Sequence, residues 1–145
     1  MKELRTEIII DSKKEKIWEI LMDFDRYPEW NPFVISLKGR ALLGETLSAH
    51  LQNPDSKPMK FNPKVTKLRK NEVFSWLGHL FFTGLFDGHH IYEIEEISEN
   101  RCKFIQREEF SGILVGIFWN TLNTKTRAGF ESMNAKLKER AELQS

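Results

Sequence analysis

An α+β protein, with a curved antiparallel sheet wrapped around a long C-terminal helix, is indicated by three features of this 145-residue sequence. Segments in which apolar and polar residues alternate follow one another from residue 33 to residue 110, with short turns between them. Two short helical segments precede them, after an isoleucine-rich first strand. An amphipathic segment near the C-terminus is the only long helix expected, and we place it on the concave face of the sheet.

The N-terminal segment is expected to form one strand and two short helices. Residues 3–10 include Ile8 and its two isoleucine neighbours, whose branched side chains favour a strand. Ser12 and Glu15 have the spacing of a capping box, which predicts a helix with Ser12 as its N-cap and Glu15 at the third helical position. A second helical segment is expected within residues 23–30, where Pro28 limits what precedes it.

Six strands are expected to follow in a meander. Their ranges are 33–38, 46–52, 59–69, 72–78, 89–97 and 101–110. Residues 79–88 contain two glycines and predict a bent strand or a lid-like loop. Within them, the segment Phe81-Phe-Thr-Gly-Leu-Phe86 would be either a gate over a cavity or a strand whose side chains pack in the core.

The last helix is expected over residues 113–141, with Ser111 as its N-cap. Apolar residues recur along it every three or four positions, which defines the face that packs on the sheet. The side chains expected inside the fold are Phe61, Phe74, Trp76, Ile94, Phe104, Phe118, Leu122 and Phe130.

Composition excludes several classes of protein. The chain has 40% hydrophobic and 30% charged residues and a net charge of +1, which gives no electrostatic case for nucleic-acid binding. A single cysteine, Cys102, excludes an intrachain disulfide and a cysteine-rich metal site. Neither a targeting segment nor an apolar run long enough to span a membrane is visible, so we expect a cytoplasmic protein. The 11 phenylalanines and 4 tryptophans suit a large core or a lined cavity.

Neither a metal site nor a covalent nucleophile is predicted, and we expect no cofactor. Adjacent strand residues point to opposite faces, so His89 and His90 do not share a metal. Cys102 lies in an expected strand, where a lone cysteine behaves as a small apolar residue. No nucleophile elbow or phosphate-binding glycine loop is present.

A polar patch is expected inside the sheet. Alternation puts His90 on the face of Tyr92 and Ile94, and it puts Gln106 and Glu108 on the face of Phe104 and Phe110. A meander makes these two strands neighbours, so a buried Glu108 would meet His90. The patch would orient a ligand or move a proton; the alternative is a purely structural network.

The segment Asp23-Phe-Asp-Arg-Tyr-Pro-Glu-Trp-Asn-Pro-Phe33, in this order of elements, resembles the START-like (SRPBCC) superfamily. That superfamily includes polyketide cyclase/dehydrase-like and Bet v 1-like proteins. Four further segments are similar to its small bacterial members: Phe74-Ser-Trp-Leu-Gly78, Gly84-Leu-Phe-Asp-Gly-His-His-Ile-Tyr92, Gln106-Arg-Glu-Glu-Phe-Ser-Gly112 and Thr126-Arg-Ala-Gly-Phe-Glu-Ser-Met-Asn134. The resemblance implies the helix-grip fold as one domain over residues 1–145. The Cys-x-His ligand pair of the iron–sulfur hydroxylases is missing, which disfavours that branch.

The resemblance implies a carrier or sensor that binds a small hydrophobic ligand, such as a lipid, a polyketide or an aromatic compound, in a cavity between sheet and helix. We expect the ligand to contact Phe61, Trp76, His90, Tyr92, Gln106, Glu108, Phe110, Phe118, Trp119, Leu122 and Thr126. Two alternatives stay open: a cyclase or dehydratase that uses His90 and Glu108, and a cochaperone-like interaction module. We expect a monomer or a weak dimer.

Overall fold

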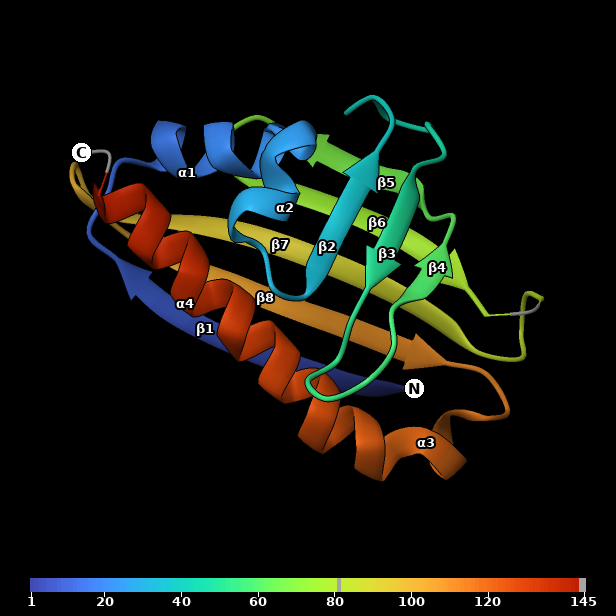
Figure 1. Ribbon diagram of the computed structural model, residues 1–145. Coiled ribbons are helices and arrows are strands. Elements are labelled where there is room, and N and C mark those ends of the chain that lie inside the picture. The colour runs from blue at the N-terminus through green and yellow to red at the C-terminus, as the bar shows by residue number, and fades with distance from the viewer. Residues whose placement is uncertain (81, 144–145) are drawn as a thin grey trace.

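A five-stranded antiparallel sheet curves around the C-terminal helix in this computed structural model, which describes residues 1–80 and 82–143 (Figure 1). A second sheet of three strands and the short helices complete the fold, which confirms the predicted helix-grip architecture. In chain order the elements are β1 (Lys2–Ile10), α1 (Lys14–Met22), η1 (Phe24–Arg26), α2 (Tyr27–Trp30), β2 (Val34–Lys38), β3 (Ser48–Leu51), β4 (Met59–Phe61), β5 (Lys64–Arg69), β6 (Val73–His79), β7 (Asp87–Ser98), β8 (Arg101–Ser111), α3 (Val115–Thr121), η2 (Leu122–Thr126) and α4 (Arg127–Leu143).

The strand order explains how the sheet surrounds the helix. The larger sheet runs β1-β8-β7-β6-β5, so the first strand pairs with the last one, and the smaller sheet runs β2-β3-β4. The two sheets are joined where the segment before β3 runs beside the start of β5: Thr46 bridges Lys64, and the Leu47 amide donates to the Pro63 carbonyl over 2.8 Å. Figure 1 shows α4 crossing the face of the larger sheet, next to the smaller one.

The predicted single strand over residues 59–69 is wrong, because the chain breaks it at Asn62 and Pro63. Proline has no N–H to donate to a ladder, so strands rarely continue through it. The break lets β4 stay in the smaller sheet while β5 enters the larger one.

Both predicted helix caps are also wrong. The helix α1 begins at Lys14, its N-cap is Lys13, and no side chain caps it. Ser12 is buried instead, and its carbonyl accepts a hydrogen bond of 3.4 Å from the Cys102 thiol. Ser111 is the last residue of β8, and a turn separates it from α3.

The last helix is continuous but not uniform. It starts at Val115, two residues later than predicted, and its turn over Leu122–Thr126 is a π-helix, in which each hydrogen bond spans five residues. Leu122 and Thr126 are both buried on this turn.

Six of the eight predicted interior residues are buried, and two are not. Phe61 is only partly buried because β4 is an edge strand of the smaller sheet. Phe118 is 43% exposed, because α3 turns this ring toward the end of the sheet, where it contacts only Phe86 among the described aromatic rings.

A close contact between α4 and Phe33 sets the distance of the helix from the smaller sheet. The Phe33 ring contacts the Phe130 ring with centroids 5.3 Å apart. A Cβ atom added to Gly129 would lie 2.6 Å from Cδ1 of Phe33. Glycine is therefore required here, even though it is a poor helix former.

Replacing Gly129 with alanine is expected to destabilise the fold by about 1–3 kcal/mol, the usual cost of overpacking a core. Gly116→Ala is the matched control, since nothing lies within 4 Å of its added Cβ. Alanine there is expected to be neutral or to stabilise by up to about 1 kcal/mol. Urea unfolding of both variants checks this, and equal effects at the two glycines would contradict it.

Candidate functional site

One row of inward-facing residues crosses the larger sheet and carries two ionisable side chains. In register, the row runs Leu4, Glu108, His90, Trp76 and Val65. The next row begins with Thr6, Gln106 and Tyr92. The strand alternation thus brings His90, Gln106 and Glu108 together on the inner face, as predicted.

His90 is completely buried among aromatic rings. Its ring centroid lies 4.6 Å from that of Tyr92, 4.9 Å from Phe130 and 5.3 Å from Trp76. These rings hold the imidazole in one orientation. Tyr92 does not extend the polar patch, because its hydroxyl points to the Met133 sulfur at 3.8 Å and burial raises its pKa above the ordinary value.

A chain of buried hydrogen bonds fixes which nitrogen of His90 carries a hydrogen. The Gln106 side-chain amide nitrogen donates to the Phe130 carbonyl over 3.3 Å and to the Asn134 side-chain oxygen over 2.7 Å. A carbonyl can only accept, so Oε1 of Gln106 must face His90, whose Nε2 lies 2.9 Å away. His90 therefore donates through Nε2.

The same chain continues to the first strand. Asn134 donates to the Thr6 hydroxyl over 2.9 Å, and Thr6 donates to the Gln106 carbonyl over 2.9 Å. All three side chains are buried. These hydrogen bonds tie α4 to β1 and β8. At the end of the series, Nδ1 of His90 is left without a hydrogen bond.

Glu108 faces that free end without satisfying it. A Glu108 carboxylate oxygen lies 3.3 Å from Nδ1, but Nδ1 has no partner in hydrogen-bond geometry. The Glu108 side chain is only 12% exposed, and among the described residues this contact is its one ion pair or hydrogen bond. A carboxylate can accept about four hydrogen bonds, so Glu108 can still accept hydrogen bonds from another group.

Gly88 makes the room for the Glu108 carboxylate. Gly88 is buried on β7 and pairs with Phe110 on one side and Gly78 on the other. A Cβ atom added to Gly88 would collide with the Glu108 carboxylate, whereas one added to Gly78 would meet only Pro63 at an ordinary 3.7 Å. The carboxylate thus lies over the backbone of its neighbouring strand.

The remaining predicted ligand contacts divide into two groups. Phe110, Phe118 and Trp119 lie beyond Glu108 at the α3 end, where Phe86 contacts both Phe110 and Phe118. The Lys2 ammonium lies over the Trp119 ring, 5.5 Å from its centroid. Leu122 and Thr126 are buried on the π-helical turn, while Phe61 is separate, on β4 of the smaller sheet. Of the segment proposed as a gate, Phe81 lies outside the described residues.

Sequence reasoning missed three residues that position the candidate site: Thr6, Asn134 and Gly88. Thr6 shares the buried face of β1 with Leu4, and Asn134 shares the buried side of α4 with Phe130 and Leu137. A polar residue inside an apolar pattern was the available signal for both. Nothing in the sequence alone distinguishes Gly88 from the other glycines.

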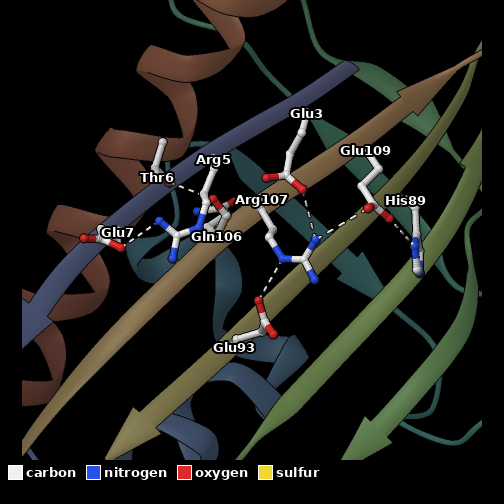
Figure 2. Close-up of polar contacts among 9 residues, drawn as sticks. All are labelled: Glu3, Arg5, Thr6, Glu7, His89, Glu93, Gln106, Arg107 and Glu109. Carbon is white, nitrogen blue, oxygen red and sulfur yellow. Dashed lines mark hydrogen bonds and ion pairs between the residues drawn. The ribbon is translucent and has the colours of Figure 1, made fainter. Parts of the chain in front are cut away.

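The outer face of the sheet carries a separate ionic network, centred on Arg107 (Figure 2). Its guanidinium lies 2.8 Å from Glu93, 3.2 Å from Glu3 and 3.7 Å from Glu109. Glu109 also contacts His89, so His89 and His90 point to opposite faces, as predicted. No three His, Cys, Asp or Glu side chains gather as a metal site in the part of the chain that the structure describes.

Cys102 is buried in β8. Burial raises the pKa of its thiol, which keeps it protonated.

Two surface hollows lie near α1, away from the polar pair. One, of about 260 Å³, is lined mainly by Asp23, Arg26 and Arg140 together with Trp30, and the other, of about 490 Å³, lies around Ser12 and Asn100. None of the predicted ligand contacts lines either hollow. No described helix is long and apolar enough to cross a membrane.

A family model described as polyketide cyclase / dehydrase and lipid transport matches residues 1–142 of this chain. Among the curated proteins, no sequence matches it.

Solved structures share its fold at low sequence identity. The Zhui aromatase/cyclase from Streptomyces sp. R1128 has a TM-score of 0.79 and 10% identity, over 99% of this chain and 94% of its own. A START superfamily protein from Mycobacterium smegmatis has a TM-score of 0.75 and 16% identity, over 99% of both chains. Norcoclaurine synthase from Thalictrum flavum, solved with dopamine and hydroxybenzaldehyde, has a TM-score of 0.76 and 12% identity, over 99% of this chain and 88% of its own.

Replacing Gly88 with alanine is expected to push the Glu108 carboxylate away from His90. The colliding atom is the end of a flexible side chain, so the fold should survive with a loss of about 1–3 kcal/mol. Gly78→Ala is the matched control on the adjacent strand and should cost nothing measurable. A crystal structure and urea unfolding of each variant test this. An unmoved Glu108 carboxylate in Gly88→Ala would contradict the role given to Gly88.

Proposed function

Because the chain belongs to the polyketide cyclase/dehydrase and lipid transport family, we propose that it binds a small apolar molecule with a hydroxyl group. The molecule would lie between the sheet and the C-terminal helix. His90 and Glu108 would hold its polar group, and the aromatic side chains around them would contact its apolar body. The protein would act as a carrier or sensor.

The observation that carries this proposal is the unsatisfied His90–Glu108 pair. Buried polar atoms in proteins are nearly always hydrogen-bonded, and leaving one unpaired costs about 1–3 kcal/mol. Here Nδ1 of a fully buried histidine lacks a hydrogen-bond partner, and the carboxylate that faces it, 12% exposed, makes no other ion pair or hydrogen bond to the described residues. A ligand hydroxyl placed between them could donate to the Glu108 carboxylate while its oxygen accepts from Nδ1–H of His90, so that one group would partner both.

The surroundings of the pair support an apolar body for this ligand. Trp76, Phe130 and Tyr92 enclose His90, and Phe110 pairs with Gly88, over which the Glu108 carboxylate lies. Ligand sites in proteins typically combine such apolar walls with a few polar groups that fix orientation. Phe118, Trp119, Leu122 and Thr126 continue the expected wall, and Phe61 would join it only from the smaller sheet.

A cyclase or dehydratase is the second candidate. The same pair could take a proton from carbon next to a carbonyl group, since a histidine or carboxylate is a suitable general base. Structures named aromatase/cyclase share the fold, which supports considering this chemistry. The two candidates differ in whether the bound molecule is altered.

Binding of 2-naphthol, measured by quenching of the tryptophan fluorescence, tests the proposal. We expect Glu108→Gln to weaken 2-naphthol binding about tenfold or more, because a hydrogen bond to a charged group contributes about 1.5–3 kcal/mol. Binding of 2-methoxynaphthalene, which has no hydroxyl hydrogen, should change less than about twofold. Glu109→Gln is the matched control, since Glu109 is on the outer face.

Failure of wild-type protein to bind either naphthalene would overturn the proposal. If Glu108→Gln weakened the binding of both compounds equally, Glu108 would not be the partner of the ligand hydroxyl. Exchange of the α-hydrogens of 2-tetralone with solvent deuterium, if lost in Glu108→Gln, would favour the enzyme over the carrier.

A further inference from the structure

Two segments without any charged residue meet at one end of this molecule. In a chain with 30% charged residues, residues 80–86 and 111–124 contain none. The structure joins them: the Ile113 amide donates to the Gly84 carbonyl over 3.2 Å, and the Leu114 amide donates to the Leu85 carbonyl over 3.1 Å. Figure 1 shows α3 and the turn before β7 at the end of the molecule opposite α1.

This end exposes large apolar side chains. Phe82 is 64% exposed, Ile113 78%, Ile117 74% and Phe118 43%. We call these four residues the apolar tip. Scattered exposed apolar residues are normal, but four of them gathered on two joined segments mark an interaction surface.

Among residues 1–80 and 82–143, no carboxylate pairs with the cations beside the apolar tip. Lys2 lies over the Trp119 ring, and Lys125 is exposed on the helical turn that follows α3. Arg127 donates to Asn123 and to the Arg5 carbonyl, and to no carboxylate of the described residues.

The acids on the strand ends beside the apolar tip each contact a basic side chain, and Glu108 among them faces His90 inside the fold. Asp87 lies 2.6 Å from His79, while Glu3 and Glu109 contact Arg107. The cations that no described carboxylate contacts, Lys2, Lys125 and Arg127, therefore lie on the helical side of the tip, at α3 and the turn that follows it. Two copies of the chain meeting tip to tip would bring these cations together, which disfavours self-association.

We propose that the apolar tip docks on a lipid bilayer that contains anionic lipids. Phe82, Ile113 and Ile117 would enter the interface between headgroups and acyl chains, and Lys2, Lys125 and Arg127 would contact anionic headgroups. This combination of apolar residues with a cationic border is what such an interface attracts. The inference does not depend on a ligand inside the fold.

Flotation with vesicles tests the docking. We expect the protein to float with vesicles of phosphatidylcholine mixed with phosphatidylglycerol, and far less with phosphatidylcholine alone. Ile117→Glu is expected to lower the partition coefficient about tenfold or more, because it removes a large apolar group and adds a negative charge. Ile97→Glu is the matched control: Ile97 is 53% exposed near the end of β7, at the opposite end of the sheet.

Lys125→Glu reports the electrostatic part separately. It should weaken binding to the anionic vesicles by severalfold and leave the slight binding to phosphatidylcholine unchanged. Thermal unfolding should show that all three variants are folded, as expected for exposed positions.

Three results would overturn the inference. The first is wild-type protein that stays unbound to anionic vesicles at low salt. The second is equal vesicle binding by wild type and Ile117→Glu. The third is a concentration-dependent dimer that Ile117→Glu abolishes, because the apolar tip would then serve a second copy of the chain.

Discussion

The direction of one buried chain of hydrogen bonds governs the interior of this protein. The backbone carbonyls of Phe130 and Gln106 can only accept hydrogen bonds. The Gln106 side-chain amide donates to the first, and the Thr6 hydroxyl donates to the second. The orientations of Gln106, Asn134 and Thr6 follow from these two points, and so does the hydrogen on Nε2 of His90. The same bonds hold α4 against β1 and β8, so the packing of the helix and the state of the histidine are set together.

This arrangement leaves Nδ1 of His90 without a hydrogen-bond partner beside Glu108. The backbone at residue 88 keeps the space that the Glu108 carboxylate occupies. Nδ1 of His90 faces Glu108, whose carboxylate has space only because residue 88 has no side chain. An unsatisfied pair in an apolar interior lowers stability, and a neutral apolar pair of the same shape would avoid that cost. Retaining such a pair is typical of functional sites, where polar groups await a ligand or a reacting group.

Strand alternation explains why much of this site could be predicted from the sequence. The period of two residues places His90, Gln106 and Glu108 on one face, and the meander makes their strands neighbours. Partners from distant parts of the chain were not predictable in this way. Thr6 and Asn134 reach the site only through the pairing of β1 with β8 and the docking of α4.

The errors in the fold prediction have local causes. Alternation continues through Pro63 in the sequence, but a residue without an N–H cannot continue the ladder, so the strand divides. The capping-box pattern at Ser12 predicts a hydroxyl that accepts from the helix backbone, but the buried Ser12 hydroxyl donates to the Lys13 carbonyl over 3.3 Å instead. Helical spacing predicted that Phe118 is inside, but it carries no information on how far the sheet extends beneath α3.

The nitrogen shifts of His90, followed by NMR while 2-naphthol is added, test the central claim most directly. The account predicts that Nε2 carries a hydrogen in the free protein and that its shift stays nearly constant, since Gln106 holds it throughout. The Nδ1 shift should move as the compound saturates the protein, because Nδ1 and Glu108 gain their missing partner. A free protein with Nε2 unprotonated, or saturation without any change at Nδ1, would contradict the account.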